Sequence, residues 1–338
     1  MQPLTYLVVT SISPPNDVLR SLSEGAVSAG IKFIVVGDEK SPLDFHIDGC
    51  QYYDLKSQRA LDFRFASVCP KRHYARKNIG YLIALSEGAE IIIETDDDNF
   101  PRPEFWGSRE RRVFSRIQSK SGWVNVYGYF TDSHIWPRGL PLDEIRKPIP
   151  RILANGNVNS PIQQALADEN PDVDALYRLT LPLPQSFRKE RPVSLNRGVW
   201  CPFNSQNTTW WREAAPLLYL PSFCSFRMTD IWRSFVAQRI AWENGWQVSF
   251  HPPTVWQDRN VHNLMQDFFD EVPGYLYNKA IADRLSSQNL KGGIDNLGSD
   301  LLTCYSAMVD GTFISAEELP LIEAWLSDLI NISESGSQ

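Results

Sequence analysis

The sequence predicts an α/β protein whose core is a Rossmann-like mixed β-sheet flanked by helices. Two apolar, β-rich runs at residues 4–10 and 31–36 enclose a helical stretch at 16–29, and a second helix at 71–87 leads into a third apolar run at 90–95. A strand, a helix and a strand in that order form a βαβ unit with parallel strands. Sheets of this type bind nucleotides beyond the carboxyl ends of their strands.

The boundaries of these first elements are set by residues that interrupt regular structure. The first apolar run ends at residues 13–15 (Ser-Pro-Pro), Gly30 closes the first helix, and Gly37 ends the second run. Gly88 separates the second helix from the run at 90–95. Proline cannot donate a backbone hydrogen bond and glycine adopts positive φ, so both residues favour turns at these places.

The second half of the chain carries shorter and less regular signals. Aromatic-rich strand candidates lie at residues 123–127 and 200–204, a last strand is predicted at 247–250, and Pro-rich stretches at 137–150 and 182–192 separate them. Long loops on an α/β scaffold are typical of functional segments.

A helix is predicted over residues 229–244. Thr229 can cap its first turn, and Trp232, Val236 and Ile240 recur at helical spacing.

The chain ends in a helical segment. We expect a main domain at residues 1–261, a helical extension at 262–332 and a disordered tail at 333–338. The last helix is predicted to begin with a capping box, Ser315-x-x-Glu318.

Composition excludes several classes of protein. The 338 residues carry a net charge of −7, which is the wrong sign for a protein that grips nucleic acid. No apolar run reaches the roughly 18 residues that a membrane span needs, so we expect no transmembrane segment and a cytoplasmic protein. The 5 cysteines are widely spaced, so we expect reduced thiols.

An acidic triplet follows the third apolar run. In extended backbone, Asp96 and Asp98 point to one side and Asp97 to the other. Two hard carboxylates, completed by substrate phosphate oxygens and water, are a common site for Mg²⁺ or Mn²⁺. The triplet therefore predicts a divalent metal site at the carboxyl end of a buried strand.

A nucleotide-binding sheet with a strand ending in Asp-x-Asp resembles the GT-A glycosyltransferases. Residues 76–81 resemble the R-N-x-G helix that precedes this motif in many of them, with Lys77 where arginine is frequent. From about residue 5 to about residue 265 the chain resembles the STELLO family of glycosyltransferases, and it resembles the plant UDP-arabinopyranose mutase-like proteins more distantly. The motifs that carry the STELLO resemblance lie at residues 94–101, 123–127, 136–142, 172–180, 203–208 and 227–234.

The resemblance implies a donor site on the first half of the sheet. Thr10, Ser11 and Asp38 stand where GT-A enzymes contact the base and ribose. Arg76 and Lys77, on the helix beside the metal, are expected near the diphosphate or ribose. Asp97 is also expected to bind the donor.

The catalytic base implied by the resemblance is Asp230, because the matching acid in GT-A folds opens a late helix. An inverting transfer needs a carboxylate that takes the proton of the acceptor hydroxyl; in a retaining enzyme Asp230 would orient the acceptor instead.

A third metal ligand is expected after the last strand. Gln257 fills the position where many GT-A enzymes have histidine, so His262 or Asp258 could replace it, or the third ligand could be absent. Arg259 is a candidate clamp for the diphosphate, since its planar fork matches phosphate oxygens.

Aromatic side chains stack on the C–H faces of sugars. The tryptophans at 136, 210, 211 and 232 are therefore candidates for an acceptor groove, and the loop motifs at residues 136–139 and 204–207 are further candidates for sugar contacts.

These observations lead to a metal-dependent glycosyltransferase that moves a sugar from a nucleotide-sugar, a UDP-sugar first, to a hydroxyl acceptor. The alternatives are a UDP-sugar mutase and a non-catalytic GT-A-like scaffold protein. A sugar nucleotidyltransferase is disfavoured, because residues 10–15 lack the Gly-rich phosphate loop of that class.

Overall fold

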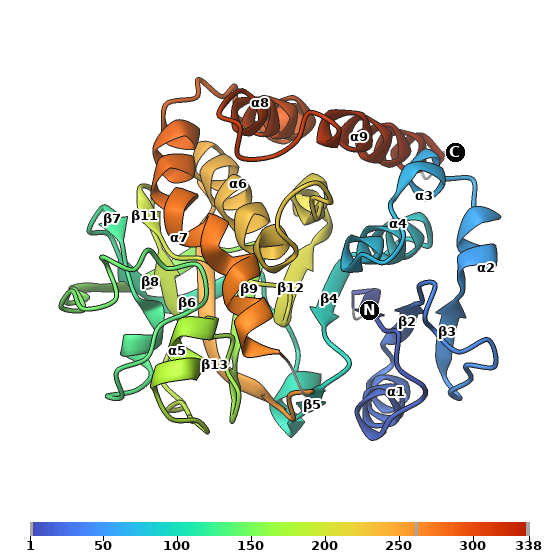
Figure 1. Ribbon diagram of the computed structural model, residues 1–338, viewed down its shortest axis with the longest axis horizontal. Coiled ribbons are helices and arrows are strands. Elements are labelled where there is room, and N and C mark those ends of the chain that lie inside the picture. Colours follow the sequence, from blue (N-terminus) through green and yellow to red (C-terminus); the bar gives the residue numbers. More distant parts are fainter. Residues whose placement is uncertain (1–2, 261–262, 336–338) are drawn as a thin grey trace.

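The computed structural model describes residues 3–260 and 263–335, and within them a large mixed sheet forms the centre of the molecule (Figure 1). In spatial order its strands are β3 (Cys50–Tyr53), β2 (Lys32–Val36), β1 (Thr5–Thr10), β4 (Ile91–Thr95), β12 (Asn207–Trp211), β9 (Ile162–Asp168), β13 (Val248–Gln257), β10 (Val193–Leu195), β6 (Arg112–Gln118) and β8 (Ala154–Asn159), with β5 (Asn99–Pro101) paired to β13. β7 (Gly122–Trp123) and β11 (Val199–Trp200) form a small second sheet.

Helices cover both faces of the sheet unequally. The helices are α1 (Asp17–Ala29), α2 (Leu55–Arg59), α3 (Arg64–Val68), α4 (Lys77–Ser86), α5 (Ala175–Thr180), α6 (Thr229–Glu243), α7 (Leu264–Ser286), α8 (Leu297–Asp310) and α9 (Glu318–Ser335). α1 lies on one face, while α4 and α6 lie on the other beneath α8 and α9 (Figure 1). The predicted α/β class with a mixed sheet flanked by helices is confirmed.

The apolar runs become central strands because both of their faces are covered. On β1, Tyr6 and Val8 enter the core under α4, whereas Leu7 and Val9 pack against α1. Burial on both faces explains why these strands read as continuous apolar runs. The Asn16 side chain caps α1 by accepting the Leu19 N–H at 2.8 Å.

The strand order brings three strand ends to one edge. β2, β1 and β4 are parallel neighbours, whereas β12 runs antiparallel between β4 and β9. Residues that follow β1, β2 and β4 therefore meet at the carboxyl edge of the sheet, where ligands bind in folds of this type.

Several predicted boundaries are wrong in the second half. The candidates at 123–127 and 200–204 contribute only Gly122–Trp123 and Val199–Trp200 as strands. β13 continues to Gln257, past two prolines that sit where its register with β9 shifts.

The R-N-x-G-like helix start has a packing role. Asn78 exchanges two hydrogen bonds of 2.9 Å with the backbone of Leu220. A Cβ on Gly80 would lie 2.5 Å from a Val8 methyl, so only glycine lets α4 approach β1 this closely.

The C-terminal helices pack against elements from both ends of the chain, since α9 contacts α3, α4 and α8. The predicted capping box does not form: the carboxylate of Glu318 accepts the backbone N–H groups of Ser222 and Phe223 instead. α9 runs to Ser335, so residues 333–335 are helical rather than a disordered tail. No helix in the described part of the chain is long and apolar enough to cross a membrane.

Candidate functional site

Two adjoining pockets lie at the carboxyl edge of the sheet. The first has a volume of ≈ 230 Å³ and the second of ≈ 340 Å³. Both are lined by Thr10, Ile12, Tyr74, Asp97 and Phe226, so they form one continuous depression. The first pocket lies over the ends of β1 and β2, and the second lies over the end of β4.

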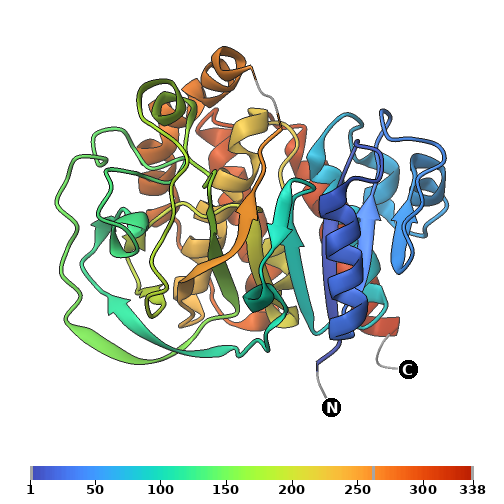
Figure 2. The same ribbon diagram turned by 90° about the horizontal axis from the view of Figure 1, so that it is seen from below.

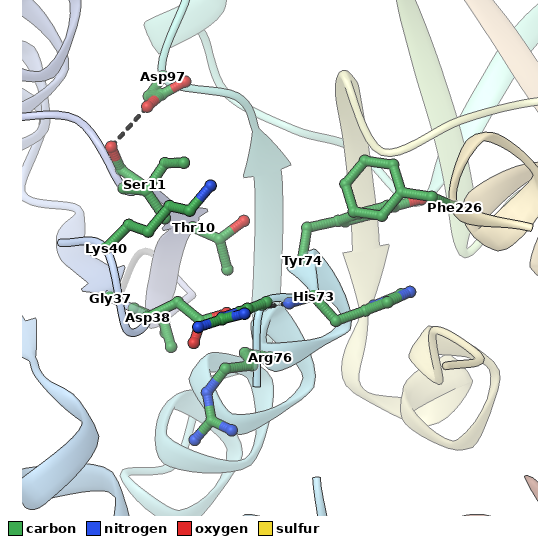
Figure 3. Close-up of a pocket in the computed structure, with 13 residues that line it drawn as sticks. Thr10, Ser11, Gly37, Asp38, Lys40, His73, Tyr74, Arg76, Asp97 and Phe226 are labelled. Carbon is green, nitrogen blue, oxygen red and sulfur yellow. Dashed lines mark hydrogen bonds between the residues drawn. The ribbon is translucent and has the colours of Figure 1, made fainter. Parts of the chain in front are cut away.

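The first pocket contains the residues predicted for the nucleoside (Figure 3). Ser11 donates a hydrogen bond of 2.5 Å to the carboxylate of Asp97, which links the end of β1 to the acidic triplet. One carboxylate oxygen of Asp38 accepts the backbone N–H of His73 at 2.9 Å. Asp38 therefore positions the turn before α4 and also borders the pocket.

An aromatic wall of the first pocket was not predicted. The rings of His73 and Tyr74 stack with centroids 5.6 Å apart, and Phe226 meets Tyr74 edge-on at 5.0 Å. Phe226 is half exposed, so its face is available to a flat ligand. These residues lie on or beside short 3₁₀ turns, where no hydrophobic period marks them in the sequence.

His73 should make the stability of the protein depend on pH. Burial lowers the pKa of His73 to about 4, and its Nδ1 accepts the backbone N–H of Ala75 at 3.0 Å. The unfolded chain, with a histidine pKa of about 6.5, binds more protons between these two values, so stability falls as the pH drops below about 6.5.

We expect His73→Asn to keep the cap and remove this titration. Relative to the wild type, the variant should gain on the order of 1 kcal/mol of stability between pH 7.5 and pH 5. Urea unfolding of both proteins at these two pH values measures the difference, and His46→Asn, at an exposed histidine, is the control. A difference between His73→Asn and wild type that does not change with pH would contradict the assignment.

The acidic triplet lies in a turn rather than in extended backbone. β4 ends at Thr95, and the backbone N–H of Asn99 donates a hydrogen bond of 3.4 Å to the carbonyl of Asp96. The expectation that Asp97 points away from its neighbours is wrong, because Asp96, Asp97 and Asp98 all line the second pocket.

Lys77 supports the triplet from beneath. Its ammonium group, which is fully buried, donates to the carbonyl of Thr95 at 2.9 Å and to Asp96 at 3.0 Å. A buried lysine needs such partners, because an unpaired charge is costly away from water. Lys77 lines neither pocket, so the expectation that it contacts the diphosphate or ribose directly is wrong, and it reaches the predicted metal site only through Asp96.

The surroundings of Asp98 fit a divalent cation. Burial and the neighbouring charge of Asp96 raise the pKa of Asp98 to about 7. The amide of Gln257 donates to both oxygens of Asp98 at 3.0 and 3.1 Å, while its own Oε1 is buried without a hydrogen-bond partner among the described residues. A cation at Asp96 and Asp98 would offset the crowded charge and give that oxygen a partner.

The described residues do not test the third ligand predicted at His262. His262 lies outside the residues that the structure describes, whereas the alternative, Asp258, is exposed and does not line the pocket. Over residues 3–260 and 263–335, no group of three His, Cys, Asp or Glu side chains could hold a metal ion. Two carboxylates with an amide oxygen remain compatible with Mg²⁺ or Mn²⁺ that is completed by phosphate and water.

Two arginines predicted to contact the donor form hydrogen bonds or ion pairs with other residues of the chain. Arg76 borders the first pocket, but its guanidinium points away from it and donates to Gln58 and to the Cys69 carbonyl (Figure 3). The expected contact of Arg76 with the diphosphate is therefore wrong in this structure. Arg259 lines the second pocket and pairs with Asp267 at 2.8 Å.

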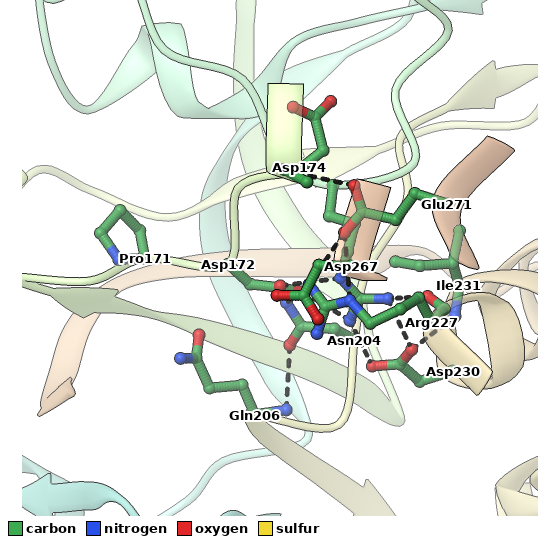
Figure 4. A network of polar contacts seen from close by, with 12 residues as sticks. Pro171, Asp172, Asp174, Asn204, Gln206, Arg227, Asp230, Ile231, Asp267 and Glu271 are labelled. Atoms are coloured by element: carbon green, nitrogen blue, oxygen red, sulfur yellow. Dashed lines mark hydrogen bonds and ion pairs between the residues drawn. The ribbon is translucent and has the colours of Figure 1, made fainter. Parts of the chain in front are cut away.

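Asp230 lies at the start of α6, as predicted, within a buried charge network (Figure 4). The Arg138 guanidinium donates hydrogen bonds of 2.9 and 3.1 Å to the carboxylate of Asp230 and two of 2.8 Å to that of Asp172. Asn204 donates to Asp172 at 2.7 Å. One guanidinium thus holds two carboxylates at the wall of the second pocket.

This pairing changes the chemistry available to Asp230. Burial raises its pKa, but the charge and hydrogen bonds of Arg138 lower it more, so the pKa of Asp230 falls to about 2. A carboxylate with so low a pKa is a weak proton acceptor near neutral pH. The geometry therefore favours Asp230 as a group that positions other groups.

The tryptophans proposed for an acceptor groove belong to the core. The indole N–H groups of Trp136, Trp210 and Trp232 donate to buried acceptors at 2.7–2.8 Å, and Trp211 is also buried. The loop motifs at residues 136–139 and 204–207, in contrast, contribute residues to the candidate site. The residues of these motifs that line the second pocket are Arg138, Ser205 and Gln206.

The fold and the site together define a class. A Rossmann-like sheet with an acidic triplet after β4, beside a pocket over β1 and β2, agrees with the GT-A resemblance of the sequence. A family model described as STELLO glycosyltransferases matches residues 227–335 of the chain.

Two curated proteins of Arabidopsis thaliana extend this similarity over nearly the whole chain. "Probable glycosyltransferase STELLO2" and "Probable glycosyltransferase STELLO1" are each 26% identical over 97% of the chain. The predicted resemblance to the STELLO family is confirmed, and it continues through the C-terminal helices beyond residue 265. The chain spans less than half of the length of these relatives, 45% and 44%.

Two solved structures are also similar. One is titled "Crystal Structure of a Mycobacterial Protein", with a TM-score of 0.41, 12% identity and coverage of 82% of this chain and 74% of that chain. The other is M. tuberculosis glucosyl-3-phosphoglycerate synthase, with a TM-score of 0.40, 11% identity and coverage of 82% and 80%.

Proposed function

We propose that this chain is a metal-dependent glycosyltransferase domain that takes a nucleotide-sugar, a UDP-sugar first, and transfers the sugar to a hydroxyl acceptor. The observation that carries the proposal is the continuity of the two pockets through Asp97. A nucleoside in the first pocket would place its diphosphate beside the acidic triplet, and its sugar would then enter the second pocket.

Each part of the site has a distinct task in this proposal. Thr10, Ser11 and Asp38 border the nucleoside, and the ring of Phe226 covers one of its flat faces. Asp96 and Asp98, with the Gln257 amide oxygen beside them, would hold Mn²⁺ or Mg²⁺, which neutralises the departing diphosphate when bound.

The acceptor side of the site is the wall formed by Arg138, Asp172 and Asp230. Since Arg138 keeps Asp230 ionised, this carboxylate accepts a hydrogen bond from an acceptor hydroxyl and fixes its direction. Orientation of the reacting groups can contribute several kcal/mol to a reaction barrier. The similarity to the STELLO proteins supports the transferase class.

Two measurements test this proposal: the stabilisation of the protein by UDP with Mn²⁺, and the release of UDP from UDP-sugars. UDP with Mn²⁺, at about 100 times its dissociation constant, should add roughly 2.7 kcal/mol to the stability of the protein. UDP or Mn²⁺ alone should add much less. The protein should then release UDP slowly from one member of a panel of UDP-sugars, and EDTA should stop the release.

Three outcomes would redirect the assignment. Interconversion of a UDP-sugar without acceptor and without UDP release would indicate a mutase. Binding without any turnover of the panel would favour a scaffold protein or a different donor. If no nucleoside diphosphate shifts the unfolding transition in the presence of metal, the proposal fails.

A further inference from the structure

The sheet face opposite α6 carries a separate polar hollow with a volume of ≈ 320 Å³. Its floor is formed by β9, β12 and β13, and residues 104–114 form its side. α1 covers the N-terminal strands of this face, whereas β13 is not covered by a helix in the view from below (Figure 2). None of the residues that line it lines the two pockets of the candidate site.

The strands present small and polar side chains to this hollow. Gln163 of β9, Thr209 of β12 and His251 of β13 line it. Their neighbours on the same strands, such as Trp210 and Phe250, enter the hydrophobic core on the other face. The alternation shows a sheet face that is not built to pack against a helix.

Arg109 lies in this hollow and forms no ion pair in the described part of the chain; Glu104, which is paired with Lys189, and Glu110 also line the hollow. Its three guanidinium nitrogens donate to the Thr209 hydroxyl at 3.1 Å and to the carbonyls of Gly107 and Phe105 at 3.1 and 2.7 Å. Each terminal nitrogen carries two hydrogens, so one N–H on each is left over. Burial lowers the pKa of Arg109 to about 10, which still leaves it charged at neutral pH.

His251 adds a second unsatisfied group. Its Nε2 is buried and has no hydrogen-bond partner within the described residues. Burial, together with the nearby charge of Arg109, lowers the pKa of His251 to about 4, so the ring is neutral at pH 7 and one of its nitrogens can donate. A half-buried cation near a buried ring nitrogen that has no partner is an arrangement that an anion would satisfy.

We infer that this hollow is a binding site for an oxyanion, a phosphate or carboxylate group of a small molecule, held by Arg109 with His251 beside it. The planar guanidinium presents paired donors that match the oxygens of either group. The site does not depend on the proposed function, because it shares no residue with the candidate site.

Calorimetric titration of inorganic phosphate, and separately of malonate, into the metal-free protein tests this inference. Phosphate or malonate should bind, and Arg109→Gln should weaken the binding at least about tenfold. Arg111→Gln, at an arginine paired with Glu213, and Arg259→Gln, in the candidate site, should leave it unchanged. Which of the two anions binds more tightly distinguishes a phosphate from a carboxylate ligand.

The inference is overturned if neither anion binds at millimolar concentration, if Arg109→Gln binds as the wild type does, or if Arg259→Gln alone removes the binding. Because Arg109→Gln could also disturb the fold, wild-type crystals soaked in selenate provide a measurement without a variant. An anomalous peak beside Arg109 is expected, and its absence there would equally reject the site.

Discussion

Replacing Asp98 by asparagine is expected to remove most of the metal-supported affinity for UDP, on the order of 100-fold or about 2.7 kcal/mol. The asparagine side chain has nearly the same shape and can still contact the Gln257 amide, so the turn should stay folded. It lacks the negative charge that a divalent cation needs from its ligand. Titration of UDP into wild type and variant, at saturating Mn²⁺ and with EDTA, measures the loss.

The matched control is Asp258→Asn, an exposed acid that lies beside Gln257 in the sequence and does not line the pocket. It makes the same change of net charge, so a general electrostatic effect would appear in both variants. The metal site would be refuted if Asp98→Asn kept the metal-dependent part of UDP binding. Equal losses in both variants would point to net charge alone.

The N-terminal half of the fold could be predicted because its strands are buried on both faces. Uninterrupted apolar runs such as residues 31–36 and 90–95 need no knowledge of partners to be recognised. The parallel βαβ order predicts that these strands end at the same edge of the sheet. It therefore also predicts that Thr10, Asp38 and the acidic triplet lie near one another.

The central antiparallel strands were missed for the opposite reason. β9 and β12 contain Gln163 and Thr209, which dilute the apolar pattern because one face of these strands borders a polar hollow. Long-range pairing decides such strands, and no local signal reports it.

The predicted roles of side chains were wrong where the side chain binds a buried partner that is distant in the sequence. Arg76 donates to Gln58 and to loop carbonyls, and Arg259 is paired with Asp267. The four tryptophans fill the core because the fold buries them, and three of them find a buried acceptor for the indole N–H. Composition and spacing identify the groups that can do chemistry, but the tertiary contacts decide which of them face the ligand.

The second large effect is expected at the ion pair between Glu94 and Arg233. Both side chains are fully buried, and Arg233 donates to Glu94 at 2.7 and 3.0 Å. Glu94 also accepts the indole N–H of Trp210 at 2.8 Å and the hydroxyl of Tyr81. The pair joins α6 to β4, so it fixes the helix that carries Asp230 against the strand that delivers the acidic triplet.

Arg233→Met should destabilise the protein by about 3 to 5 kcal/mol, because it leaves the Glu94 carboxylate charged and buried without a cation. The double variant Glu94→Gln with Arg233→Met should recover part of this loss, since it leaves no uncompensated charge. Urea unfolding followed by tryptophan fluorescence measures both values.

Arg188→Met, at the exposed pair with Asp132, should cost no more than about 1 kcal/mol and serves as the control. If Arg233→Met cost as little as this control, the buried pair would not be what holds α6 to β4. Apolar packing around Trp210 and Trp232 would then have to fix the position of Asp230. If the single variant is strongly destabilised and the double variant is partly rescued, charge compensation at the base of α6 is what keeps the wall that contains Asp230 opposite the acidic triplet.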